Sequence, residues 1–148
     1  MKTLTVIFII SMFCANTIIS QTQIDSAKII FEATNGEFKN TSGLYYPDCG
    51  GDYTAQLLDL NKDGQPEVLV QVGQGCLTGI AGNHMELYIK DKNEKWNTQF
   101  GFDGFPNILE TTNLGYPDIE ITGPGFCFPV WRWNGEKYDL FKKCPEKF

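Results

Sequence analysis

Short runs of apolar and alternating residues fill most of the chain after residue 50 and predict β-strands. Turns rich in glycine, asparagine and aspartate separate these runs, which is typical of antiparallel sheets. The predicted strands are TAQLLDL, PEVLVQV, HMELYIK, KWNTQFGF, NILETT, PDIEITG, PVWRW and KYDLFKK.

One helix is predicted before these strands. Asp25 is placed to cap the segment SAKIIFEAT, in which Ile29, Ile30 and Ala33 form an apolar stripe. The helix should end at Asn35-Gly36, because glycine adopts the left-handed conformation that closes helices. The predicted fold class is therefore mainly β, with one short N-terminal helix.

The strand pattern repeats along the chain. Pro66 and Pro117 are 51 residues apart, and the same offset aligns a glycine and a cysteine of the two copies. Further on, YIKDKNEKWN resembles WRWNGEKYD at an offset of 42, so the first copy has a loop nine residues longer. Copies at about 54–102 and 105–144, each of about four strands, predict a tandem of two β repeats. We expect an antiparallel sheet, a sandwich or a half-propeller-like pair.

The first 20 residues are MKTLTVIFIISMFCANTIIS, with a lysine, an apolar run and then small and polar residues. This order is typical of a secretory signal peptide cleaved after Ser20. A membrane anchor is the alternative, but polar residues interrupt the apolar run before it reaches the length of a spanning helix. We expect a secreted or periplasmic protein with a single domain at 21–148 and no stable membrane insertion after cleavage.

Four cysteines follow the leader, namely Cys49, Cys76, Cys127 and Cys144. An even number of cysteines in an exported chain favours two disulfides. Zinc is the weaker alternative, because the chain has no C-x-x-C spacing after the leader and His84 is its only histidine.

The disulfide pairing depends on the last predicted hairpin. A four-residue loop at 134–137 would place Cys127 opposite Cys144 and leave the other two cysteines to pair with each other. A two-residue Asn-Gly turn would place Cys127 opposite Lys142 instead. Three connectivities therefore remain open.

Charge narrows the possible partners. The chain has a net charge of −6, and removal of the leader takes away one lysine and no acid. An acidic protein is a poor partner for nucleic acid or an anionic membrane, since both require neutralising cations. The charge suits a metal cation or a basic protein.

The segment DLNKDGQPE, residues 59–67, presents oxygen atoms at alternate positions. Its oxygen donors are Asp59, Asn61, Asp63, the main-chain carbonyl of Gln65, and Glu67. Calcium takes six to eight such oxygens, and Gly64 permits the sharp turn. The acidic twelfth residue of an EF-hand is missing, so the loop should join two strands. A polar β-turn is the alternative, but three carboxylates so close together repel one another unless a cation intervenes.

DLNKDGQPEVLV resembles the D-x-N-x-D-G-x-x-D/E-hydrophobic repeats of the FG-GAP and VCBS type, found in integrin-like propellers and in secreted bacterial proteins. The resemblance implies a calcium loop between two strands. The ligands that it implies are Asp59, Asn61, Asp63, the Gln65 carbonyl and Glu67. The second copy has Thr112 and Leu114 where ligands would stand, so one calcium ion with a structural role is expected.

Three further features are candidates for function. His84 has no nucleophile-elbow serine in the sequence, so we interpret it as a polar residue entering a strand and predict no catalytic site. Trp131 and Trp133 share one face of a strand, and core packing is favoured over stacking on a glycan or a protein partner. The glycine-rich loop at 73–83 differs between the copies and is the predicted recognition surface.

The sequence thus predicts a secreted or periplasmic calcium-binding β-domain that acts as a binding module and is not an enzyme. The acidic charge suggests a first alternative, an inhibitor or immunity-type protein of a basic enzyme. The two tryptophans suggest a glycan-binding module, and the many acids leave a carboxylate-based hydrolase as the last alternative.

Overall fold

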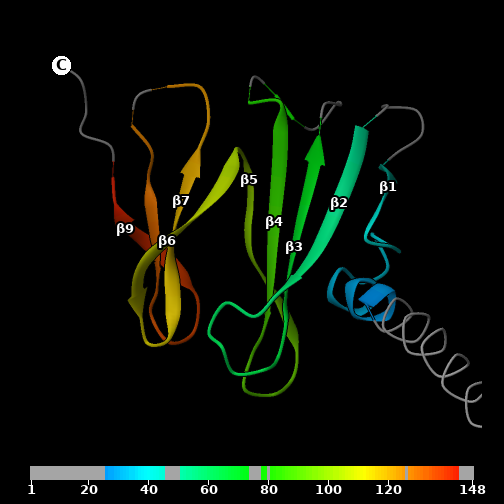
Figure 1. Cartoon of the computed structure of the whole chain (residues 1–148), viewed down its shortest axis with the longest axis horizontal. Coiled ribbons are helices and arrows are strands. Elements are labelled where there is room, and N and C mark those ends of the chain that lie inside the picture. Colours follow the sequence, from blue (N-terminus) through cyan, green and yellow to red (C-terminus); the bar gives the residue numbers. More distant parts are fainter. Residues whose placement is uncertain (1–25, 46–50, 74–77, 80, 126, 144–148) are drawn as a thin grey trace, which may run out of the picture.

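The computed structural model describes residues 26–45, 51–73, 78–79, 81–125 and 127–143. Within these ranges nine strands form two antiparallel sheets, one ordered β1-β2-β3-β4-β5 and the other β6-β7-β8-β9 (Figure 1). The strands are β1 (Ser42–Tyr45), β2 (Gly51–Leu58), β3 (Glu67–Gly73), β4 (Asn83–Lys90), β5 (Trp96–Asp103), β6 (Phe105–Asn113), β7 (Tyr116–Thr122), β8 (Val130–Trp133) and β9 (Tyr138–Lys142). Neighbours in each sheet are also neighbours in sequence, so both sheets are meanders.

The predicted fold class is confirmed, since the described chain is mainly β, antiparallel and carries one short helix. All eight predicted strands are present. The ninth strand, β1, was not predicted, because SGLY is short and shows no alternation; it pairs with β2 at the edge of the first sheet. In the described ranges, no helix has both the length and the apolar character needed to cross a membrane.

The helix covers residues 26–33 of the described chain and packs on the first sheet. Ile30 and Ala33 are buried, and Ile29 packs beside them, as the predicted stripe requires. The helix ends as expected: Asn35 has a φ of 52°, and the N–H of Gly36 donates to a carbonyl five residues back, at 2.7 Å. The predicted cap, Asp25, lies outside the described residues.

Both faces of the first sheet are buried. Val68, Val70 and Val72 of β3 face the helix, together with Phe38. The opposite face of the sheet includes Leu69, Met85, Leu87 and Phe100, and it packs against Ile119, Ile121, Trp133 and Tyr138 of the second sheet. The fold therefore has three layers, with the helix, the five-stranded sheet and the four-stranded sheet stacked in that order.

The chain passes from the first sheet to the second at Gly104, the one residue between β5 and β6. Gly104 has a φ of 144°, and its N–H donates to the carbonyl of Asn83 at 2.8 Å. A Cβ at this position would lie 2.7 Å from the carbonyl oxygen of Thr122. Only glycine tolerates both this φ angle and this close approach, so glycine is needed at the joint between the two meanders.

Equivalent turns of the two meanders lie at the same end of the molecule, the lower end in Figure 1. Lys90 pairs with Trp96 across the β4–β5 turn, and Trp133 pairs with Tyr138 across the β8–β9 turn. The second pair confirms the four-residue loop at 134–137 and rules out the two-residue alternative. Cys127 belongs to a disulfide, but the other three cysteines lie outside the described residues, so the predicted pairing stays a prediction.

Candidate functional site

The acidic loop connects β2 to β3, as the sequence predicts. Leu58 pairs with Glu67 at its base, and residues 59–66 project beyond the sheet. Lys62 and Gly64 have φ angles of 61° and 85°, and no atom lies within 4 Å of a Cβ built at Gly64. The glycine is thus required by the backbone conformation of the turn and not by crowding.

Hydrogen bonds inside the loop orient its side chains. The two carboxylate oxygens of Asp59 accept the N–H groups of Asp63 at 3.0 Å and Gly64 at 3.1 Å. Asn61 accepts the N–H of Asp63 at 3.1 Å and donates its amide to the Asp63 carboxylate at 2.8 Å. Asp63 also accepts the N–H of Gln65 at 2.7 Å. Each carboxylate oxygen retains a second lone pair, so the loop still offers oxygen ligands.

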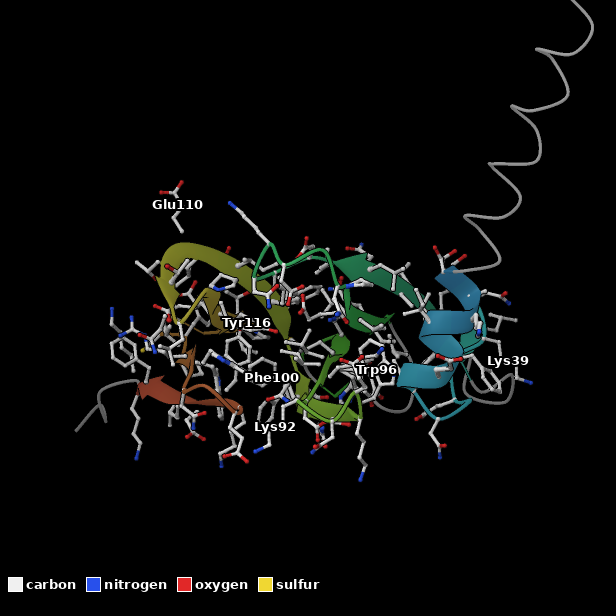
Figure 2. The ribbon with its side chains drawn as sticks, turned by 90° about the horizontal axis from the view of Figure 1, so that it is seen from below. Lys39, Lys92, Trp96, Phe100, Glu110 and Tyr116 are labelled. Atoms are coloured by element: carbon white, nitrogen blue, oxygen red, sulfur yellow. The ribbon has the colours of Figure 1, made fainter. Side chains whose placement is uncertain are left out.

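Glu67 is the inner end of the loop and is only 4% exposed. One carboxylate oxygen accepts the N–H of Leu60 at 2.7 Å, and the other accepts the hydroxyl of Tyr116 at 3.1 Å. Figure 2 shows Tyr116 pointing into the interior of the molecule. Burial raises the pKa of Glu67, the two hydrogen bonds oppose that shift, and the Asp63 carboxylate adds to it. In the described part of the chain no cationic side chain forms an ion pair with Glu67.

The same position of the second meander also holds a buried acid. Asp118 lies 51 residues after Glu67 and is 2% exposed. Arg132 binds it through two nitrogens, Nε at 2.8 Å and Nη2 at 2.7 Å, and the hydroxyl of Thr111 donates at 2.6 Å. The Arg132 guanidinium lowers the pKa of Asp118. Among the described residues, the two equivalent carboxylates therefore differ in charge compensation, since Arg132 supplies a cation to Asp118 and no cationic side chain pairs with Glu67.

The five predicted ligands are brought together only in part. Asp59, Asn61 and Asp63 are joined by hydrogen bonds, whereas Glu67 faces the second sheet. Within the described ranges, no three side chains of the His, Cys, Asp and Glu types gather as a metal-binding group. The donors of the loop are carboxylate, amide and carbonyl oxygens, a set suited to a hard cation such as calcium and unsuited to zinc.

His84 stands between two carboxylates. Its Nδ1 lies 2.9 Å from Asp103, and its Nε2 lies 3.5 Å from Glu86, which also accepts the hydroxyl of Tyr88. Burial raises the pKa of Tyr88, with a further contribution from Glu86. This arrangement ties β4 to β5.

The two tryptophans of β8 share one face, as predicted, and that face lies against the first sheet. Trp133 is 8% exposed, and its ring centroid lies 4.5 Å from that of Tyr116. Trp131 packs edge-on against Phe100 at 5.4 Å. Trp133 belongs to the core between the sheets, whereas Trp131 is partly buried and packs against that core, so the two indoles together form no exposed stacking platform.

Sequence reasoning missed a cavity of about 380 Å³ at the opposite end of the sheets from the acidic loop. Phe102 and Asp103 of β5 line it, together with Trp131 of β8. Ala81 also contributes, so part of the predicted recognition loop reaches the cavity, although positions 74–77 and 80 of that loop lie outside the described residues. No local motif indicates the cavity, because its walls come from separate strands.

Sequence reasoning also missed Tyr116 and Arg132 as partners of the buried acids. The 51-residue offset contained part of the signal, since it aligns Glu67 with Asp118. Comparison with protein-family models, curated proteins and solved structures found no match to this chain.

Proposed function

We propose that this chain is an exported calcium-binding β-domain that acts as a binding module. Calcium binds the loop at residues 59–67 and has a structural role. Its ligands are Asp59, Asn61, Asp63, the Gln65 carbonyl and Glu67. Export is supported by the leader-like first 20 residues and by the cysteine content, and a binding role by the acidic charge.

The contrast between Glu67 and Asp118 is the observation that supports calcium most strongly. A buried carboxylate without a cation destabilises the folded state, because it has lost its hydration without gaining a counter-charge. Arg132 removes that cost at Asp118. Calcium in the loop would remove it at Glu67 and would also offset the repulsion among the three carboxylates of the loop.

The position of the loop explains what bound calcium would do. Glu67 begins β3 and contacts Tyr116 at the start of β7, so one carboxylate links the loop to both sheets. A cation that holds this carboxylate would stabilise the packing of the second sheet on the first. Calcium would bind the folded state alone and shift the folding equilibrium by mass action.

Thermal unfolding with calcium and with EDTA tests the proposal. At calcium concentrations about 100 times the Kd, the Tm of the wild type should rise by about 10 °C. Asp59→Asn and Asp63→Asn should lose most of that rise. Asp52→Asn, which changes an exposed acid of β2 away from the loop, should retain it. A wild-type Tm that is the same in calcium and in EDTA would refute calcium binding.

A further inference from the structure

We propose that the cleft between the β4–β5 and β8–β9 turns binds a neutral oligosaccharide that carries N-acetyl groups. Both turns lie at the lower end of the molecule in Figure 1. Two cavities, of about 350 and 470 Å³, form the cleft, and Asp91 of the first turn and Glu136 of the second line both of them. The proposal rests on the binding role proposed above and names its ligand. It does not rest on calcium, because no residue of the acidic loop lines the cleft.

A β-bulge directs the side chain of Gln99 into the cleft. The register between β4 and β5 shifts at Leu87 and Tyr88, which leaves Gln99 without a partner residue on β4. Its side chain reaches the second sheet, where Oε1 accepts the N–H of Tyr138 at 3.1 Å. This bond fixes the orientation of the amide and leaves its NH2 group as a donor to a ligand. Bulges often re-aim a side chain in this way next to a functional site.

Asn97 offers the complementary group in the same cavity. Its Nδ2 donates to the main-chain carbonyl of Lys95 at 2.9 Å, and its side chain also hydrogen-bonds to the Asp91 carboxylate. The amide nitrogen is therefore held, and Oδ1 remains as an acceptor. Asn97 and Gln99 are both half-buried, so they are oriented and still open to a ligand. An acceptor and a donor placed in this way match the N–H and the carbonyl oxygen of an acetamido group.

The charges of the cleft balance one another, which favours a neutral ligand. Its lining has three lysines and two acids, and Lys90 and Lys137 are ion-paired with acids outside the lining, at 3.1 and 3.3 Å. Two main-chain N–H groups already bind Asp91, at 2.8 and 3.1 Å. Lys92, which lies at the surface in Figure 2, and Glu136 remain, with one charge of each sign. A ligand with hydroxyl and amide groups and no net charge therefore fits better than an ion.

The two cavities have similar linings, which favours a ligand made of repeated units. Each has a lysine, a side-chain amide and one aromatic residue, Trp133 in the first cavity and Tyr138 in the second. These aromatic residues are only 8% and 3% exposed, so neither ring can hold the apolar side chain of a peptide. Sugar rings supply several hydroxyl groups per unit to the two shared carboxylates and to the lysines. An oligosaccharide is therefore favoured over a peptide.

The test is an NMR titration of the full-length protein with triacetylchitotriose, a neutral oligosaccharide with an N-acetyl group on every ring. We expect saturable binding with a Kd of about 1 mM, together with shifts of the side-chain amide signals of Asn97 and Gln99. Cellotriose, which has hydroxyl groups in place of the N-acetyl groups, should bind at least about 5-fold more weakly. The peptide acetyl-Ala-Ala-Ala-amide should not saturate below about 20 mM.

Gln99→Glu is the most specific variant. The new carboxylate can still accept the N–H of Tyr138, but it has no hydrogen to donate to the ligand. It should weaken the binding of triacetylchitotriose about 5-fold or more. Gln56→Glu, which makes the same change at an exposed glutamine of β2, should leave the affinity unchanged.

Glu136→Ala gives an independent measurement, because it changes an exposed turn residue that lines both cavities. It should weaken binding about 3-fold or more, whereas Glu32→Ala, at an exposed glutamate of the helix, should have no effect.

Wild-type affinity in either Gln99→Glu or Glu136→Ala would overturn the assignment to this cleft. Equal affinity for triacetylchitotriose and cellotriose would overturn the proposal, as would no saturation by triacetylchitotriose below about 20 mM. Saturable binding of the peptide without binding of triacetylchitotriose would overturn it in favour of a peptide ligand. Each titration is run in calcium and in EDTA, and binding should persist in EDTA, so failure of the calcium proposal is recorded separately.

Discussion

The hydroxyl of Tyr116 in β7 donates to the carboxylate of Glu67 in β3 across the two sheets, at 3.1 Å. The Tyr116 ring in turn stacks on Trp133, at 4.5 Å between centroids. The innermost residue of the acidic loop is therefore connected to the aromatic core by one hydrogen bond and one ring contact. A change in the charge or position of Glu67 should be detected at Trp133.

Tyr116→Phe should lower both the stability of the calcium-free protein and its affinity for calcium. The lost hydrogen bond to a carboxylate is worth about 1–2 kcal/mol, and a side chain that orients a metal ligand typically contributes about tenfold to metal affinity. Urea unfolding in EDTA and calorimetric titration with calcium measure the two effects.

Tyr88→Phe is the matched control, since it removes another tyrosine hydroxyl that donates to a glutamate, Glu86, away from the loop. This variant should lose stability and keep its calcium affinity. Equal calcium affinity in both tyrosine variants and the wild type would show that Tyr116 does not orient a calcium ligand.

Glu67→Gln should make the calcium-free protein at least as stable as the wild type at neutral pH. Burial raises the pKa of the Glu67 carboxyl above its ordinary 4.5, so the folded state favours the protonated form. The contribution of this group to stability is present below the ordinary pKa and is lost as the pH rises through the raised value. The amide side chain avoids that loss, because it keeps an acceptor and carries no charge.

Urea unfolding in EDTA between about pH 4 and pH 7 measures this effect as a flatter pH dependence in Glu67→Gln than in the wild type. In calcium the order should reverse, because the variant has lost a ligand. A variant that is about 2 kcal/mol less stable than the wild type in EDTA at neutral pH would show that the carboxylate stabilises the fold without a metal.

The local pattern of apolar and polar residues was enough to predict the strands. The contacts at the candidate site could not be predicted in this way, because they join residues that lie far apart in the sequence. The spacing of apolar residues in PEVLVQV and PDIEITG predicted β3 and β7 correctly, because the three valines of β3 all face the helix and the two isoleucines of β7 both face the first sheet. The acidic loop was also placed correctly between its strands. The partners of the buried acids depend on contacts over 49 residues for Tyr116 and 14 residues for Arg132, which no local rule reports.

Asp118→Asn should destabilise the protein by about 2–3 kcal/mol at neutral pH, because it leaves the Arg132 guanidinium without its anion. The Arg132 side chain is 30% exposed, so solvent limits the cost below that of a fully buried pair. Asp139→Asn, at an acid that is 52% exposed, should cost less than about 0.5 kcal/mol.

The same ion pair should make the fold acid-sensitive. Arg132 lowers the pKa of Asp118 below its ordinary 3.8, so the contribution of this group is present above 3.8 and is lost as the pH falls through the lowered value. Wild-type stability from urea unfolding should therefore fall below about pH 4, and Asp118→Asn should show a smaller fall. Parallel pH profiles for the two proteins would contradict this assignment.

Gly104→Ala, at the joint between β5 and β6, should destabilise the protein by about 3 kcal/mol. The added methyl group would lie 2.7 Å from the carbonyl oxygen of Thr122 and 2.8 Å from Cγ2 of Ile121, at a φ of 144° that alanine rarely adopts. Neither neighbour can move easily, since one is backbone and the other belongs to the core between the sheets.

Gly101→Ala, three residues earlier in β5, is the matched control, because no atom lies within 4 Å of its added Cβ and its φ is not positive. Urea unfolding of both variants should give a loss of about 3 kcal/mol at Gly104 and a change within about 0.5 kcal/mol at Gly101. A change at Gly104 as small as the change at Gly101 would mean that the joint between the meanders tolerates a side chain and that glycine is not required there.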